Sequence, residues 1–281
     1  MNTGAGLLIA LITVGGCASR SGPVMPAAIL LFTGTGTSHG DVEAMGTLLS
    51  SHHLDYVTAD SAQLNRMAAT DLQRYRLLIV PGGNFIEMGN SLNANTTANI
   101  RNAVKGGVNY LGICAGAFLA GDFPAAYFPA NDGTLNLTSG VHFSFYSASG
   151  KGIRKTPVAV TMADGRTLEH YWEDGPQLTG WGDVIGKYPD GTPAIVEGTF
   201  GSGFVILTGV HPEAPERWRH GMTFATPASA DNAYAMALIR AALKRAVTGH
   251  DLCPGQGLFS SRCFRLSVAT GDRLAASSAR L

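Results

Sequence analysis

The sequence feature that most constrains the fold is an alternation of short apolar runs with helical patterns between residues 27 and 120. Four runs of four to seven residues are rich in apolar side chains, which is typical of parallel strands buried on both faces. They are residues 27–33, 54–59, 77–80 and 108–113. Helical spacing occupies residues 41–53, 61–75, 96–105 and 115–120. This order predicts an α/β fold with a doubly wound, mostly parallel sheet and right-handed crossovers.

The pattern changes from about residue 135. Short β-like runs are separated by turns such as Ala-Asp-Gly at 163–165, and we expect them to be antiparallel additions to the same domain. These runs are residues 141–146, 156–162, 167–172, 184–188, 194–198 and 204–208. Residues 231–247 have the spacing of a final helix, with Asp231 as its expected N-cap. The domain is therefore predicted to span residues 27–250, followed by an irregular tail at 251–281.

Composition narrows the class of protein. The 281 residues suit one or two domains, and 45% hydrophobic with only 14% charged residues excludes a disordered chain. Lys and Arg number 20 and so do Asp and Glu, so charge gives no indication of a nucleic-acid partner.

Residues 1–16 are predicted to be a lipoprotein-type signal peptide. The apolar stretch at 4–14 is too short to span a bilayer, and small residues precede Cys17 as in the bacterial lipoprotein box. We expect Cys17 to be lipidated, residues 17–26 to be a tether, and the protein to face the periplasm in the bacterial cell envelope, touching the membrane only through this anchor. The first three residues carry no Lys or Arg, so an ordinary signal peptide or a mis-assigned start codon remains open.

The strongest chemical signal is a cysteine between an apolar strand and a helix. Cys114 has Gly112 two residues before it and Gly116 two residues after it. A sharp strand–nucleophile–helix elbow needs small residues at these places, because bulky neighbours would collide. A helix N-terminus behind Cys114 would favour the reactive thiolate, so we expect a nucleophile rather than a buried core cysteine.

Two further loops follow apolar runs. Pro-Gly-Gly at 81–83 can direct the backbone N–H groups of Gly82 and Gly83 at a developing oxyanion. His211 and Glu213 follow the run at 204–208, where the imidazole can act as a base toward Cys114 and the carboxylate can orient it. Because ligands bind at the carboxyl edge of open α/β sheets, we expect the three loops to form one site.

Together these motifs resemble the class I glutamine amidotransferase-like fold. Pro-Gly-Gly at 81–83, the elbow at 110–118 and an aromatic residue, Phe118, four positions after the cysteine are similar to the biotin-protein ligase N-terminal domain family. The resemblance covers about residues 27–250. It implies a flavodoxin-like sheet, a triad of Cys114, His211 and Glu213, and an oxyanion hole from the N–H groups of Gly83 and Ala115.

The departures from the resemblance bear on function. Glutamine-hydrolysing relatives usually place Gln where this chain has Phe118, and neither a synthetase domain nor a biotin ligase catalytic domain is recognisable here. We expect an exported cysteine-dependent hydrolase that acts on an amide, peptide or related acyl substrate but not on free glutamine, and that uses no cofactor or metal. The alternative is a non-catalytic binding module of the envelope.

Several features have weaker interpretations. The loop at 34–40 only partly matches a dinucleotide fingerprint, so we expect it to line the Cys114 pocket, with Ser38 and His39 near the substrate. The stretch 170–176, which includes Tyr171 and Trp172, is either a specificity pocket or a strand end with a turn. Cys253 and Cys263 either form a disulfide in an oxidising compartment or are incidental.

Overall fold

The computed structural model describes residues 27–128, 134–148 and 154–244. Cys17, Cys253 and Cys263, together with the predicted signal peptide, tether and tail, lie outside the described residues. Within the described part of the chain, no helix is long and apolar enough to cross a membrane.

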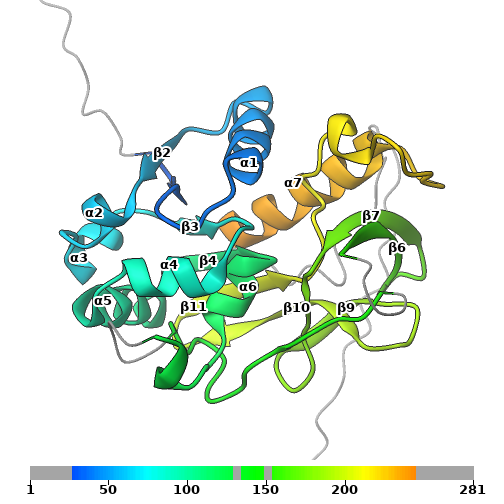
Figure 1. The fold of residues 1–281 in the computed structure, drawn as a ribbon. Coiled ribbons are helices and arrows are strands. Elements are labelled where there is room, and N and C mark those ends of the chain that lie inside the picture. Colours follow the sequence, from blue (N-terminus) through cyan, green and yellow to red (C-terminus); the bar gives the residue numbers. More distant parts are fainter. Residues whose placement is uncertain (1–26, 129–133, 149–153, 245–281) are drawn as a thin grey trace, which may run out of the picture.

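One half of the large sheet is parallel, as the sequence predicted (Figure 1). Its strands are β1 (Ile29–Phe32), β2 (Tyr56–Ala59), β3 (Leu77–Val80), β4 (Asn109–Ile113) and β11 (Gly203–Thr208). They lie in the order β2-β1-β3-β4-β11, each parallel to its neighbour. This is the flavodoxin-like order, and the predicted fold class is confirmed.

The other half of the sheet is antiparallel. Beyond β11 come β10 (Pro193–Phe200), β9 (Asp183–Lys187), β6 (Lys155–Met162) and β7 (Thr167–Glu173). A separate two-stranded sheet pairs β5 (Ser144–Phe145) with β8 (Pro176–Gln177). The expected antiparallel additions are confirmed, although only two residues of the run at 141–146 form a strand.

Helices cover both faces of the sheet (Figure 1). One face carries α1 (His39–Ser51) and α7 (Ala228–Lys244), whose buried residues share a core with Ile29 and Leu31 of β1. The other face carries α2 (Ser61–Leu64), α3 (Ala69–Leu72), α4 (Phe85–Ser91), α5 (Ala94–Lys105) and α6 (Ala115–Ala120). Two 3₁₀ turns complete the elements, at Ala125–Tyr127 and Glu216–Arg219.

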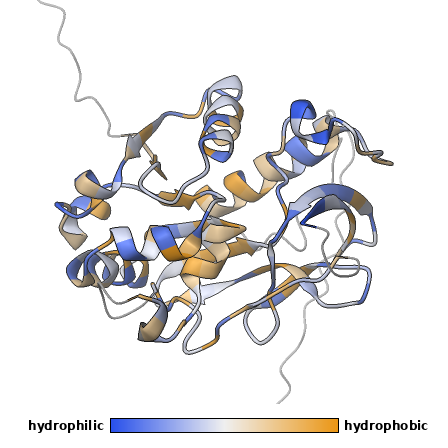
Figure 2. Cartoon of the chain, in the orientation of Figure 1, coloured by the Kyte–Doolittle hydropathy of each residue, from blue (hydrophilic) through white to orange (hydrophobic). Residues whose placement is uncertain are grey.

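Strand side chains alternate between these two cores. Leu30 and Phe32 join the core under α2 to α6, whereas Ile29 and Leu31 join the core under α1 and α7. Figure 2 shows hydrophobic residues gathered along the central strands and on the inner sides of the helices. Burial on both faces is why the strands are continuous apolar runs in the sequence.

Three details differ from the sequence-based expectation. Residues 61–75 form two short helices, because a second helix start follows α2: the Ala68 N–H donates to the Asp71 carboxylate at 3.0 Å, which caps α3. The short helix α4, capped by Asn84, was not expected. Asp231 is not the N-cap of the last helix: α7 begins at Ala228, and the buried Asp231 carboxylate instead pairs with Arg219.

Candidate active site

Cys114 occupies the sharp turn between β4 and α6. Its backbone has φ 49° and ψ −103°, a conformation that residues other than glycine rarely adopt. The residue is 6% exposed, and Sγ lies 3.5 Å from the backbone oxygen of Glu173. Nucleophile elbows, the sharp turns between a strand and a helix, have a strained backbone of this kind at the top of a sheet.

The two glycines beside Cys114 are required by close packing. A Cβ on Gly116 would lie 2.0 Å from the backbone oxygen of Val80, and one on Gly112 would lie 2.6 Å from the oxygen of Gly116. The Tyr110 hydroxyl donates a buried hydrogen bond of 2.7 Å to that same Gly116 oxygen. The spacing that marked Cys114 in the sequence therefore has a direct steric cause.

His211 is fixed on the loop after β11. Its backbone N–H donates to the oxygen of Tyr171 at 2.9 Å, which ties the loop to β7. The ring centroids of Tyr171 and Trp218 each lie 5.8 Å from that of the imidazole. The two rings are inclined to the imidazole by 72° and 75°. His211 is 4% exposed, so its ring position is determined by packing as well as by hydrogen bonds.

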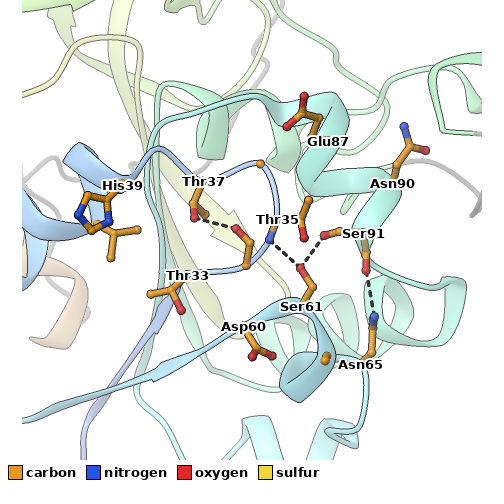
Figure 3. Close-up of a pocket in the computed structure, with 14 residues that line it drawn as sticks. Thr33, Thr35, Thr37, His39, Asp60, Ser61, Asn65, Glu87, Asn90 and Ser91 are labelled. Atoms are coloured by element: carbon orange, nitrogen blue, oxygen red, sulfur yellow. Dashed lines mark hydrogen bonds between the residues drawn. The ribbon is translucent and has the colours of Figure 1, made fainter.

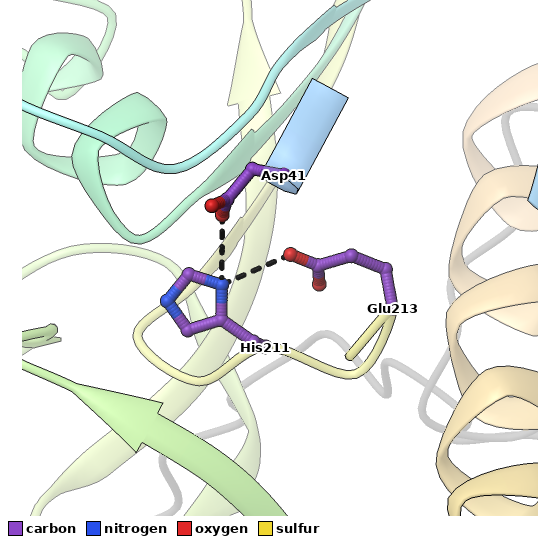
Figure 4. Close-up of side chains that lie close together, drawn as sticks. All are labelled: Asp41, His211 and Glu213. Atoms are coloured by element: carbon purple, nitrogen blue, oxygen red, sulfur yellow. Dashed lines mark hydrogen bonds and ion pairs between the residues drawn. The ribbon is translucent and has the colours of Figure 1, made fainter. Parts of the chain in front are cut away.

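Two carboxylates meet the same nitrogen of His211 (Figure 4). Glu213 Oε1 lies 2.9 Å from Nδ1 in an aligned hydrogen bond. Asp41 Oδ1 lies 3.1 Å from Nδ1 as an ion-pair contact, and this oxygen accepts no aligned hydrogen bond from the described residues. Because Nδ1 faces the acids, Nε2 is the nitrogen that can exchange a proton with a reacting group.

Burial and charge set the protonation of these groups. Burial lowers the pKa of His211, but the acidic groups beside it, Glu213, Asp41 and Cys114, outweigh that effect, so this pKa lies well above its usual value. Burial raises the pKa of Glu213 above its ordinary range, although the charge of His211 opposes the rise. The pKa of Asp41 is lowered: burial alone would raise it, but the charge of His211 and hydrogen bonding from Ser38 and the Gly82 backbone prevail.

Asp41 is the site residue that the sequence analysis missed. An acidic residue in the first turn of a helix is an ordinary feature, and Asp41 stands there in α1. Its contact with His211 joins residues 170 positions apart and depends on where α1 packs. The only local signal is the neighbouring loop at 34–40, which was expected to lie at this edge of the sheet.

The expected oxyanion donors lie at the same place. Gly83 and Ala115 both line the cavity that contains Cys114. The bridge between Thr37 and Gly83 uses the oxygen of Gly82 and the N–H of Asn84, so the Gly83 N–H takes no part in it. Ala115 is the first residue of α6, where backbone N–H groups have no partner inside the helix.

Cys114 and His211 open into one cavity of about 470 Å³. Its walls combine polar groups near the thiol with three aromatic rings, Phe85, Phe118 and Phe145. Phe118 stacks on Phe85 with ring centroids 4.8 Å apart, and the ring centroid of Phe145 lies 4.7 Å from that of Phe118. The structure thus places Phe118 in the same cavity as Cys114, and Phe145 joins it from another part of the chain.

The stretch at 170–176 contributes to this cavity only in part. Glu173 and Asp174 line it, with Asp174 paired to Arg154 at 2.6 Å. The Tyr171 ring packs against the imidazole, whereas Trp172 is 1% exposed and belongs to the core. In this stretch Glu173 and Asp174, rather than Trp172, therefore form part of the cavity wall.

A second, larger cleft of about 1080 Å³ lies beside the first at the same edge of the sheet (Figure 3). His39 lines this cleft, whereas Ser38 lines the Cys114 cavity. Residues of the loop at 34–40 thus line both spaces. The contribution of this loop to the reactive pocket therefore comes from Ser38 and from Asp41 just beyond it, and the expectation that His39 touches a substrate there remains untested.

Asp41, His211 and Glu213 are also the described residues whose ligand atoms come close enough together, within 4.8 Å, to share a metal ion. Their separations of 2.9 and 3.1 Å are those of direct hydrogen-bond and ion-pair contacts. We therefore treat the three side chains as a proton-sharing cluster.

Comparison with known proteins supports the class expected from the sequence. Residues 27–156, somewhat under half of the chain, match the family model described as "Biotin-protein ligase, N terminal". The matched segment runs from β1 through the Cys114 elbow, and His211 and Glu213 lie beyond it. No curated protein matches the chain.

Solved structures with a similar fold are remote in sequence. A glutamine amidotransferase is 18% identical with a TM-score of 0.48, over 66% of this chain and 90% of that one. A putative GMP synthase subunit from Thermoplasma acidophilum is 14% identical with a TM-score of 0.44, over 76% and 98%. A GH42 beta-galactosidase from G. stearothermophilus is 14% identical with a TM-score of 0.46, and the match spans 76% of this chain but 30% of that one.

The chain folds as an α/β domain whose parallel strands have the flavodoxin-like order. Residues 27–156 of this domain are similar to the N-terminal domain of biotin-protein ligases. The resemblance inferred from the elbow and glycine loop is confirmed.

Proposed function

We propose that this protein is a cysteine-dependent hydrolase acting on an amide, peptide or related acyl substrate. The observation that carries the proposal is the strained Cys114 elbow opening into the same cavity as His211, whose Nδ1 is held by Glu213. A nucleophile, a base and an orienting acid in one cavity are the groups that acyl transfer requires.

In the first step the Cys114 thiolate attacks the substrate carbonyl carbon. The carbonyl oxygen becomes an oxyanion, and the N–H groups of Gly83 and Ala115 stabilise it. His211 gives the proton on Nε2 to the leaving amine or alcohol as the carbon–leaving-group bond breaks. The product of this half-reaction is a thioester on Cys114.

In the second step water replaces the thiol. His211, now neutral at Nε2, takes a proton from the water as the oxygen attacks the thioester, and the same oxyanion donors act again. The acid is released and the thiolate–imidazolium pair is restored. The raised pKa of His211 suits this cycle, because it favours the protonated imidazole that donates to the leaving group.

The aromatic wall favours an acyl group with a large apolar part. Phe118 and Phe85 offer ring faces beside Cys114, and Phe145, which is 60% exposed, extends this surface outward. The ammonium and carboxylate of free glutamine would lose water against these rings without gaining polar partners from them, at a cost of about 1–3 kcal/mol per group. The charged side chains that also line the cavity already have partners: Arg154 pairs with Asp174, and Glu173 accepts from the Tyr171 hydroxyl. Glutamine should therefore be a poor substrate.

Two assays test the proposal. One measures hydrolysis of p-nitroanilides and thioesters that bear phenylalanyl or benzoyl groups, in the intact protein and in Cys114→Ala. The other measures ammonia release from millimolar glutamine. Cys114-dependent hydrolysis of the aromatic compounds is expected, without comparable ammonia release. Equal rates in wild type and Cys114→Ala on every compound would favour the alternative, a binding module that keeps the pocket.

We also propose that the protein is exported and anchored in the bacterial envelope through lipid on Cys17. The proposal rests on the apolar stretch at 4–14 and the small residues before Cys17. Mass spectrometry of the mature N-terminus tests it, together with fractionation of wild type and Cys17→Ser. A lipid-modified N-terminus at residue 17 and release of the variant from membranes are expected. A mature chain that begins elsewhere would refute the idea.

A further inference from the structure

His211 has two acidic neighbours at one nitrogen, although a single N–H can make only one well-aligned hydrogen bond. We propose that the acids divide the work: Asp41 is a positioning residue that supplies the fixed negative charge beside His211, while Glu213 stays uncharged and orients the ring through its hydrogen bond. This inference rests on the proposed hydrolase and adds a fourth residue to its machinery.

The surroundings of Asp41 favour a carboxylate. It lies in the first turn of α1, a helix of 13 residues, where the helix dipole stabilises negative charge. The N-cap Ser38 and the backbone of Gly82 provide hydrogen bonding to its side chain. The Asp41 side chain is 8% exposed, so water screens its charge only weakly from His211.

The surroundings of Glu213 favour the neutral acid. Its side chain is wholly buried, and Oε2 has no hydrogen-bond partner among the described residues. A charge is much more costly than a neutral polar group in such a place. Two carboxylates that converge on one nitrogen also repel each other, which favours protonation of the less solvated one.

The packing at Gly82 shows that the Asp41–His211 contact is built into the fold. A Cβ at this position would lie 2.1 Å from Asp41 Oδ1 and 2.7 Å from Cε1 of His211. Only glycine therefore allows the carboxylate and the imidazole to come together at this point. The first glycine of Pro-Gly-Gly thus makes room for the pair, while the second, Gly83, has φ 143°.

Few other ionisable groups face the imidazole. Cys114 reaches it from the elbow and Tyr171 from β7, and Trp218 covers it with an uncharged ring. Tyr171 is itself committed, because its hydroxyl donates to Glu173. Asp41 and Glu213 are thus the two acids that can set the charge of His211 directly.

The experiment is an NMR pH titration of the ring of His211 in protein labelled at histidine, with the signal assigned by its loss in His211→Gln. We compare the intact protein with Asp41→Asn and Glu213→Gln, which keep shape but cannot ionise. Glu43→Gln is the matched control, since it removes one charge from the exposed side of α1, where Glu43 pairs with Arg217. Circular dichroism verifies the fold of each variant.

Asp41→Asn is expected to move the titration of His211 by about one pH unit or more toward acid. Glu213→Gln should leave the midpoint close to that of the intact protein, because glutamine mimics the neutral acid, and Glu43→Gln should also leave it in place. The opposite pattern, a large shift in Glu213→Gln and none in Asp41→Asn, would overturn the inference. If Asp41→Asn does not fold, a shift in Glu213→Gln alone decides against it, and an unshifted midpoint supports it.

The titration does not depend on turnover, so it separates this inference from the proposed function. An inactive protein with the expected titrations would refute the hydrolase and leave the division between the two acids intact. An active protein with the opposite titrations would support the hydrolase and refute the division between the two acids.

Discussion

Two cavities share the carboxyl edge of the sheet, and they differ in almost every physical respect. The Cys114 cavity holds about 470 Å³, with a strained thiol, a buried imidazole and aromatic walls. The neighbouring cleft holds about 1080 Å³ and is lined mainly by hydroxyl and amide side chains, among them Thr35, Ser61 and Asn65 (Figure 3). The proposed function assigns the chemistry to the smaller cavity, where the loops after β3, β4 and β11 come together. On this proposal, cavity size alone does not identify the active site.

The walls of the two cavities are held differently. In the larger cleft the polar groups bond to one another: the Thr35 N–H donates to Ser61 Oγ at 3.0 Å, and the hydroxyls of Ser61 and Ser91 lie 2.7 Å apart. In the smaller cavity the close contacts bring together a base and two acids. The hydrogen bonds in the larger cleft stabilise the loop that contains Thr35. The contacts in the smaller cavity change the pKa of His211.

The largest expected effect comes from removing the thiol. Cys114→Ala should lower hydrolysis of the aromatic test substrates by about a thousandfold or more, because the nucleophile is lost. Ser61→Ala in the larger cleft should leave the rate unchanged. Steady-state kinetics on both variants measure the contrast. A Ser61→Ala protein as inactive as Cys114→Ala would contradict the assignment of the reaction to the Cys114 cavity alone.

A smaller but still large effect is expected at Gly82. Gly82→Ala would wedge a methyl group between Asp41 and His211, and misplacement of a catalytic group by about 1 Å can lower the rate by about a hundredfold. Gly46→Ala is the control, since Gly46 lies inside α1 with an ordinary helical backbone and a Cβ there meets only the hydroxyl end of Tyr56, at 3.0 Å. Both variants carry one added methyl, so equal activity in the two would show that the wedge has no consequence.

The aromatic wall should contribute a moderate effect. Phe145→Ala should raise KM for aromatic substrates by about three- to tenfold, in line with the loss of an aromatic contact of about 0.5–1.5 kcal/mol. Tyr127 is similarly exposed, at 52%, but does not line the Cys114 cavity, so Tyr127→Ala should behave as wild type. A KM that depends equally on both rings would indicate a nonspecific apolar surface.

The smallest effects concern stability against pH. The raised pKa of Glu213 means that its stabilising contribution is present below the unfolded pKa and is lost as pH rises through the folded value. Glu213→Gln should therefore gain stability relative to wild type as pH rises.

Asp41 has a lowered pKa, so its stabilising contribution is present above the pKa of the unfolded state and is lost as pH falls through the pKa of the folded state. Asp41→Asn should accordingly lose stability at neutral pH and approach wild type in acid.

Thermal unfolding from pH 4 to 8 measures both trends. Differences in Tm of about 2–4 °C correspond to about 1 kcal/mol in a domain of this size. Parallel curves for wild type and both variants at every pH would contradict the assigned directions of the two pKa shifts.

The sequence predicted much of this fold because the signals were local. The apolar run at 77–80 became β3 with the same bounds, and the strand before Cys114 became β4. The glycines at 112 and 116 marked the elbow because the steric conflict lies within a few residues. His211 and Glu213 were found because each follows a recognisable strand end.

What the sequence could not predict depends on distant packing. Asp41 gains its partner only because α1 packs where the loop after β11 passes, and no spacing within α1 records this. Phe145 reaches the pocket from a two-residue strand whose pairing could not be anticipated from its composition. The break between α2 and α3 goes with a second helix start, where the Asp71 carboxylate accepts from the Ala68 N–H, and the apolar spacing of residues 61–75 does not record it.

The positive φ of Cys114 sets thermodynamics against chemistry at a single position. Holding a residue with a Cβ in such a backbone conformation costs about 1–3 kcal/mol, which glycine would largely avoid. A chain selected for stability alone would thus be expected to drift toward glycine at position 114. The cysteine at this position therefore makes folding less favourable than glycine would, which is the trade-off expected of a residue kept for the chemistry of its thiol, as the proposed function requires.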